Sequence, residues 1–189
     1  MEGNNGNGKG NEHFQQVEYF ISPSRGQRVF LEVVADVIEF ISEDEASKYT
    51  VVVGTDSEQA NGSAEFVSVV VVHRVGKHGR YFWKRMRGIK AFDRHDRILK
   101  EASFSLDLAQ RVIGELRAQL QEHLYDFEIH LDIGQNGPTK NMIQEIVGMI
   151  TGSGFTARIK PDSYAANKVA DRHVNGNGSG ISKKKPVLA

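Results

Sequence analysis

The chain lacks cysteine altogether among its 189 residues. This absence excludes a disulfide framework and any metal site built on thiolates. The chain also lacks a charge excess, because 24 basic residues balance 24 acidic ones, so no overall field attracts nucleic acid or an anionic membrane. No run approaches the roughly 18 apolar residues of a membrane span, and the N-terminal stretch "MEGNNGNGKGNEHF" has no apolar signal core. We therefore expect a soluble, cytoplasmic protein with no membrane partner.

The two ends differ in composition from the middle. Residues 1–13 and 175–189 are rich in Asn, Gly, Ser and Lys, and we expect both to be disordered tails, while 14–174 forms one domain. Apolar spacing of three and four predicts helices, and alternation predicts strands. After a leading helix over 29–41, the expected order is βββαβαβα, with strands at 49–56, 64–76, 80–92, 126–134 and 155–160, and helices at 95–123, 138–150 and 162–174.

Two predicted strands end in a carboxylate. The stretch "VVVGTDSEQ" runs straight into Asp56, and alternation in "DFEIHLDIG" places Asp132 on the polar face at the strand end. If these strands are neighbours, Asp56 and Asp132 converge where ligands collect in open α/β sheets. Two adjacent carboxylates repel, and hard oxygen ligands without cysteine suit Mg or Mn. The alternative is that both residues begin Asx-turns.

Four segments carry a family resemblance. The motifs "GTDSE", "HLDIGQNGPTK", "GMITGSGF" and "KPDSYAANKVADRH" closely resemble the bacterial YkuK family, which is ribonuclease H-like, from about Tyr49 to His173. The element order is also that of the ribonuclease H-like fold. The resemblance implies an α/β fold with a five-stranded mixed sheet, a central first strand, helices on both faces and here an extra N-terminal helix. It also implies acidic residues in the first strand, first core helix, fourth strand and last helix, which here are Asp56, Glu101, Asp132 and Asp171.

The helical candidates have competing interpretations. Glu101 borders the buried stripe of its helix, but it could be an ordinary ion-pair residue. Asp171 competes with Asp162 as the fourth ligand, although Asp162 also suits a helix N-cap. His173 could shuttle protons beside the metals or simply interact with a helix dipole. A mononuclear site of His73, His130 and Asp132 is conceivable, but its spacing matches no metal motif.

The segment "RYFWKRMRGIKAFDRHDRILK" is locally basic and interleaved with aromatic residues, which suits phosphate contacts and base stacking. The alternative is an edge strand that uses basic side chains against aggregation. The candidate nucleic-acid-binding residues are Lys84, Arg85, Arg87, Lys90 and Arg94.

These observations predict a metal-dependent nuclease that hydrolyses phosphodiester bonds with two divalent cations. Asp56 would bridge them, Asp132 and Glu101 would complete one site, and Asp171 would help to hold the other. The partner would be RNA, DNA or a hybrid. The alternatives are a non-catalytic nucleic-acid-binding or protein-interaction module on the same fold and a nucleotide-handling enzyme that uses the same pocket.

Overall fold

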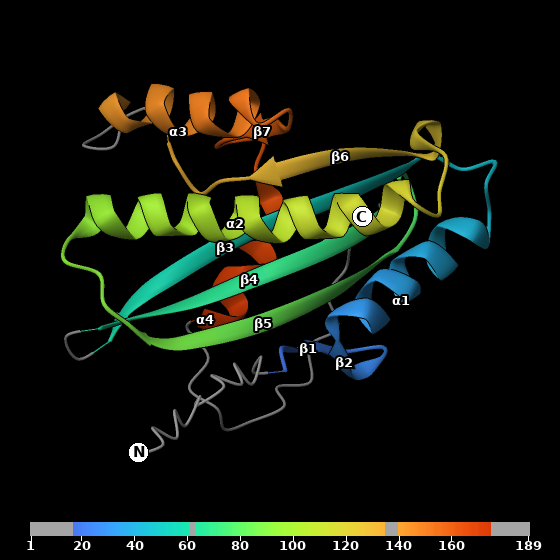
Figure 1. Cartoon of the computed structure of the whole chain (residues 1–189), viewed down its shortest axis with the longest axis horizontal. Helices are drawn as coiled ribbons and strands as arrows, with labels where there is room; N and C mark the ends of the chain where they lie inside the picture. The colour runs from blue at the N-terminus through green and yellow to red at the C-terminus, as the bar shows by residue number, and fades with distance from the viewer. Residues whose placement is uncertain (1–16, 61–62, 135–139, 175–189) are drawn as a thin grey trace, which may run out of the picture.

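The computed structural model describes residues 17–60, 63–134 and 140–174 (Figure 1). Their strands form one seven-stranded mixed sheet in the order β2-β1-β5-β4-β3-β6-β7. The five predicted strands are β3 to β7, and two further strands precede them. The bounds are β1 Tyr19–Ser22, β2 Gly26–Val29, β3 Tyr49–Ala60, β4 Ser63–Arg74, β5 Gly79–Ile89, β6 Tyr125–His130 and β7 Thr156–Arg158. The predicted tails, 1–13 and 175–189, and the turn at Asn61-Gly62 lie outside the described residues.

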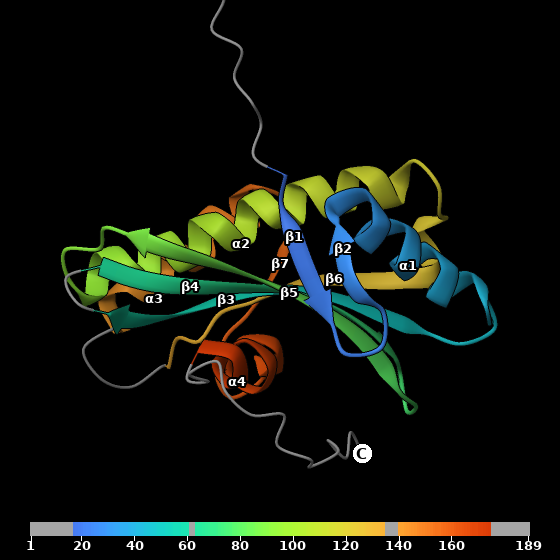
Figure 2. The same cartoon turned by 90° about the horizontal axis from the view of Figure 1, so that it is seen from below.

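Helices cover both faces of the sheet, as predicted. Figure 2 shows α1 and α2 on one face and α4 on the other. The bounds are α1 Phe30–Ser42, α2 Arg94–Arg117, η1 Glu122–Leu124, α3 Lys140–Gly152, the π-helical η2 Ala165–Ala170 and α4 Asp171–Val174. Across the described residues, no helix combines the length and the apolar surface needed to cross a bilayer.

Strand alternation divides the core between the two faces. On β3, Val51 and Val53 join the large apolar cluster beneath α1, α2 and α3, whereas Val52 joins a smaller cluster with Ala170 of η2. All three valines are fully buried. Each contributes about 1.5–3 kcal/mol relative to an exposed side chain, so both helical layers are fixed on the sheet.

The position of β3 creates the geometry of the site. It pairs antiparallel with β4 along its whole length and parallel with β6 only as far as Gly54 and His130. Among the five predicted strands, the first one is therefore central, as the resemblance implies, since β4 and β5 lie on one side of β3 and β6 and β7 on the other, with β7 parallel to β6. Beyond Gly54, β3 continues without pairing to β6, and the carboxyl end of β6 lies beside this part of β3.

The N-terminal hairpin was not predicted, and it changes both the number of strands and the position of β5 in the sheet. β1 and β2 pair with each other, and β1 pairs with β5 at Ile21 and Trp83, so the sheet has seven strands rather than five and β5 is not an edge strand. The hypothesis of an edge-strand guard is therefore wrong for the part of β5 around Trp83 that pairs with β1. Each missed strand has only four residues, too few for a clear alternation.

Candidate active site

The part of β3 beyond Gly54 carries polar side chains on both faces. Thr55 is fully buried and its hydroxyl lies 2.8 Å from that of Ser68 on β4. The Ser57 hydroxyl donates a 2.5 Å hydrogen bond to Oε1 of Glu101 on α2. Because residues alternate along a strand, Asp56 lies on the face opposite Ser57. The Ser57 backbone N–H donates to Oδ1 of Asp56 over 2.9 Å.

Glu101 is the most perturbed carboxyl of the site. It is 7% exposed and lies on α2 against the extended part of β3. Burial raises its pKa to about 8, the Ser57 hydrogen bond opposes this shift, and the charges of Asp56 and Asp132 add to it. Arg97 counteracts them in part. Glu101 therefore holds a proton at neutral pH because its surroundings disfavour the ionised form.

Asp132 is the third predicted carboxylate, and its charge acts on Glu101. It follows β6 by two residues, and its Oδ1 lies 2.5 Å from Nζ of Lys160. Asp56 lies two residues beyond the last paired position of β3, so the same register carried forward sets Asp56 opposite Asp132. The effect of both charges on the Glu101 pKa is consistent with this convergence. Asp56 and Asp132 therefore lie near the carboxyl end of β6, and Glu101 interacts electrostatically with both from the α2 face.

The donor chemistry of this acidic site fits a hard divalent cation. All the donors are carboxylate or hydroxyl oxygens, the ligands that Mg²⁺ and Mn²⁺ prefer, and a cation would relieve the repulsion around Glu101. Within residues 17–60, 63–134 and 140–174, however, no three acidic or histidine side chains stand close enough to form a ready-made metal site. Asp132 would have to exchange Lys160 for the ion.

The fourth predicted ligand is placed by its backbone alone. Asp171 begins α4, which follows η2, and both segments lie against β3 and β4. The side chain of Asp171 lies outside what the structure describes. Asp162 is exposed in the turn after β7, where its backbone N–H donates to the Ile159 carbonyl over 2.9 Å. The choice between Asp171 and Asp162 stays a prediction.

His173 packs on aromatic side chains. Its ring stacks on Trp83 with centroids 4.2 Å apart and 12° between the planes, and its backbone carbonyl accepts a hydrogen bond from Arg85. Burial lowers its pKa to about 4, and Arg172 and Arg85 add to the effect, so the ring is neutral at pH 7. These contacts assign His173 a packing role that anchors α4 on β5, and its predicted proton shuttling stays untested.

His130 has a structural role that the sequence did not reveal. It is 1% exposed, its Nε2 lies 2.9 Å from Oε2 of Glu128, and its Nδ1 accepts from the Tyr164 backbone N–H over 3.1 Å. Glu128 in turn accepts from Arg158 of β7. Because both ring nitrogens are engaged, the alternative metal site with His73 and Asp132 has no ligand at His130.

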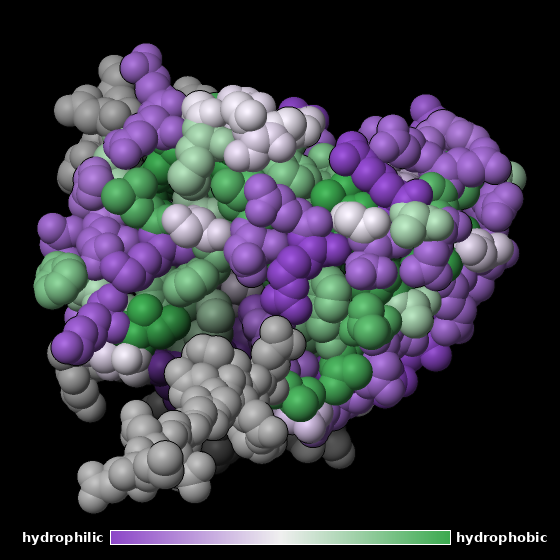
Figure 3. Space-filling model, viewed as in Figure 1, coloured by the Kyte–Doolittle hydropathy of each residue, from purple (hydrophilic) through white to green (hydrophobic). Residues whose placement is uncertain are grey.

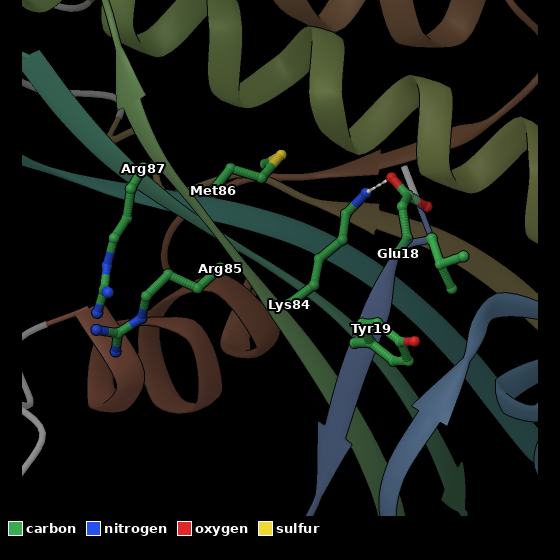
Figure 4. A pocket seen from close by; sticks show the side chains of 7 residues that line it. Glu18, Tyr19, Lys84, Arg85, Met86 and Arg87 are labelled. Carbon is green, nitrogen blue, oxygen red and sulfur yellow. Dashed lines mark hydrogen bonds and ion pairs between the residues drawn. The ribbon is translucent and has the colours of Figure 1, made fainter. Parts of the chain in front are cut away.

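The predicted nucleic-acid-binding residues divide into two groups. Lys84 points toward the α2 face and pairs with Glu18 over 2.7 Å, while Arg85 and Arg87 point toward the α4 face (Figure 4). Both arginines pair with Glu65, at 2.7 Å and 3.0 Å. All three line a pocket of about 610 Å³ between β1 and β5. Lys90 and Arg94, by contrast, are fully on the surface. The five residues therefore do not form one stripe.

Ser57 and Lys160, two polar residues that contact the carboxylates, were not predicted from the sequence. Ser57 follows Asp56 directly in "GTDSE", and alternation alone could have placed it on the α2 face. Lys160 precedes a proline in "ARIKPD", and no local pattern links it to Asp132, since their contact depends on the parallel pairing of β6 and β7. Ser57 donates a hydrogen bond to Glu101, and Lys160 forms an ion pair with Asp132, so both act on the electrostatics of the acidic site.

Comparison with known proteins identifies the family of the chain. Residues 32–175 match the family described as "Ribonuclease H-like", and the chain belongs to that family. Its sequence is 32% identical over 167 residues to the "Uncharacterized protein YkuK" of Bacillus subtilis (strain 168). That alignment covers 81% of this chain and 95% of the relative, so the resemblance to the YkuK family is confirmed. No solved structure gives a significant match to the chain.

Proposed function

We propose that this protein is a metal-dependent nuclease that hydrolyses phosphodiester bonds at the acidic site of Asp56, Glu101 and Asp132. The observation that carries the proposal is the buried carboxyl of Glu101, whose pKa is raised to about 8 beside two further carboxylates. Such an arrangement destabilises a fold, and strongly perturbed carboxyls gather at functional sites. Family membership supports the same class of chemistry.

The chain's own residues would prepare this site. A divalent cation held by the three carboxylates supplies charge stabilisation and an activated water for in-line displacement at phosphorus. Glu101 must first release its proton, and the Ser57 hydroxyl assists because its hydrogen bond favours the ionised carboxylate. Lys160 pairs with Asp132, and its ammonium would suit a phosphate oxygen of the substrate. Asp171 and Asp56 would hold a second cation.

A substrate panel tests the proposal. Labelled single-stranded RNA, single-stranded DNA, both duplexes and a hybrid are incubated with the full chain in Mg²⁺ or Mn²⁺. We expect wild-type cleavage of at least one substrate and its loss in Asp56→Asn and Glu101→Gln, with oligonucleotide binding kept. Asp107→Asn is the matched control, because Asp107 is 68% exposed on the same helix as Glu101. Full cleavage by both site variants would refute the assignment.

The cation has a second readout that does not depend on turnover. Binding to the folded state alone should stabilise the wild type by about 2.7 kcal/mol at a cation concentration of 100 times Kd. The melting temperature should therefore rise with Mg²⁺ or Mn²⁺ in the wild type and in Asp107→Asn. In Glu101→Gln the rise should be much smaller. Equal shifts in all three proteins would place the cation elsewhere.

Two observations favour the non-catalytic alternative. The Lys160–Asp132 ion pair already neutralises one carboxylate, and the described residues contain no ready-made group of three ligands. A nucleic-acid-binding module that kept the fold without the activity would show both features. In the same panel, binding without cleavage in either metal would select this module.

A further inference from the structure

The loop between β5 and α2 exposes an aromatic ring. Phe92 is 89% exposed, more than any other large apolar side chain of the described residues, among which Leu31 follows at 63%. In Figure 3 the surrounding end of this face is largely hydrophilic, at the place where β5 turns into α2 in Figure 1. An aromatic ring left in water forgoes about 1.5–3 kcal/mol of burial, so its position needs a reason.

The backbone on both sides of Phe92 is anchored, by hydrogen bonds on one side and by apolar burial on the other. Asp93 caps α2 by accepting from the Asp96 backbone N–H over 2.8 Å. Asp96 in turn accepts from the Phe92 backbone N–H over 2.9 Å and pairs with Lys100. On the other side, Ala91 is buried against the small cluster that includes Phe66. The exposed ring therefore stands on an anchored turn and is not part of a frayed segment.

The charge around the ring is positive where it meets solvent. Lys90 and Arg94 are exposed; of the two nearby acidic groups, Asp96 pairs with Lys100, and the exposed Asp93 accepts the helix-capping hydrogen bond. No ion pair among the described residues involves Lys90 or Arg94, in contrast to Arg85 and Arg87, which both pair with Glu65. A ring between two unpaired cations is complementary to a base that is flanked by phosphates.

The turn also leads directly to the acidic site. Glu101 lies seven residues after Arg94 along α2, a distance of about 10 Å along the helix axis. That length corresponds to roughly three nucleotide steps of a stacked strand at about 3.4 Å each. A strand held at the turn can therefore reach the carboxylates without a further contact surface.

We infer that the β5–α2 turn docks single-stranded nucleic acid, with the Phe92 ring stacked on an unpaired base and Lys90 and Arg94 on the neighbouring phosphates. The inference rests on the proposed function for the direction of the strand, which would run toward Glu101. Stacking requires an unpaired base, so the substrate class is single-stranded nucleic acid or a duplex with a single-stranded extension.

Binding without cleavage tests this inference. Fluorescence anisotropy with the full chain in EDTA compares single strands, a blunt duplex and a duplex with an overhang, each as RNA and as DNA. We expect Phe92→Ala to weaken binding of single strands and overhangs by about 5- to 100-fold and to leave the blunt duplex unchanged. Phe92→Trp should restore the affinity. Leu31→Ala removes a comparably exposed apolar side chain from α1 and should change nothing.

The salt dependence of binding tests the proposed phosphate contacts of Lys90 and Arg94 separately. Lys90→Gln and Arg94→Gln should each reduce the log-log salt slope for single strands by about 0.7. Arg87→Gln should reduce it less, because Arg87 is paired with Glu65. An unchanged slope in both Lys90→Gln and Arg94→Gln would remove the phosphate contacts from the inference.

The outcomes separate this inference from the proposed function. Unchanged affinity in Phe92→Ala, or an equal loss for blunt duplex and single strands, would overturn the docking role. Failure of the wild type to bind any oligonucleotide would overturn it too and would favour a protein partner for the turn. A wild type that binds through Phe92 but cleaves nothing in Mg²⁺ or Mn²⁺ would refute the nuclease and leave the docking surface standing.

Discussion

Asp36 on α1 and Glu101 on α2 are buried to the same extent, each 7% exposed, yet their surroundings are opposite. Asp36 lies between two guanidinium groups, 3.3 Å from Arg25 and 2.9 Å from Arg28. Glu101 has a hydroxyl at 2.5 Å and two carboxylates nearby. The first carboxylate joins α1 to the adjoining β1–β2 hairpin, and the second has no comparable structural use.

The comparison shows that burial by itself does not identify a functional carboxylate. Removing a charge from water costs several kcal/mol, and a well-placed counter-charge offsets that cost. At Glu101 the charge of Arg97 offsets only part of that cost, so the pKa is raised and the group retains a proton. Among the described residues, the lack of a direct ion pair therefore distinguishes Glu101 from Asp36.

The largest expected effect is at Asp36. Replacing both Arg25 and Arg28 with Gln leaves a buried carboxylate without a counter-charge, and we expect the free energy of unfolding to fall by about 3 kcal/mol. Adding Asp36→Asn should recover a substantial part of the loss. Urea unfolding at pH 7 measures all three proteins. A loss below about 0.5 kcal/mol in the double variant would mean that Asp36 is as uncompensated as Glu101, and the contrast would fail.

The second effect is the pH dependence of stability that Glu101 causes. Its pKa is raised to about 8 from an ordinary value of 4.5, so the folded state binds the proton more tightly than the unfolded state. Its contribution is complete below pH 4.5 and is lost progressively as pH rises to about 8.

Glu101→Gln removes this contribution. The difference in unfolding free energy between wild type and Glu101→Gln should therefore change across pH 5 to 8 and level off above it. Urea unfolding at a series of pH values gives the difference directly. A difference that is flat over the whole range would contradict a raised pKa of Glu101 in the folded protein.

The smallest effect concerns the hydroxyl that supports Glu101. Ser57→Ala removes a hydrogen bond worth about 1 kcal/mol and should move the midpoint of the Glu101 titration upward, because the bond favours the charged form. Carboxyl chemical shifts measured by NMR against pH report that midpoint. Ser103→Ala is the control, because Ser103 is an exposed serine of α2, the helix that carries Glu101. A downward shift in Ser57→Ala would contradict the assigned role.

The larger elements could be predicted because their patterns are long. The stripe over 29–41 and the stripe over 95–123 correspond to α1 and α2, and the three predicted meander strands correspond to β3, β4 and β5. The β1–β2 hairpin was missed, and with it the burial of Lys84, since Glu18 and Phe20 enclose that side chain only because β1 docks on β5. Alternation along β5 would have separated Lys84 from Arg85, but it could not have revealed their partners.

The acidic site was predictable only in outline. Asp56 and Asp132 end two strands, and that local pattern predicts their convergence once the strands are taken as neighbours. The burial of Glu101 and its contact with Ser57 depend on where α2 crosses the sheet, which no local pattern determines. The contacts of His130 likewise depend on the path of the chain after β7, because its Nδ1 meets Tyr164, 34 residues later.

The long sequence separation between β1 and β5 has a consequence for folding. β5 follows β4 through the short turn at Gly76, while its contact with β1 joins Lys84 to Glu18, 66 residues earlier. Closing the longer loop costs more entropy and slows the pairing, so we expect β3, β4 and β5 to associate first. During that interval β5 is a temporary edge, and Lys84, Arg85 and Arg87 then lie along an unpaired strand. Positive charge on such an edge opposes pairing between nascent chains, which protects the protein during folding even though β1 covers this strand afterwards.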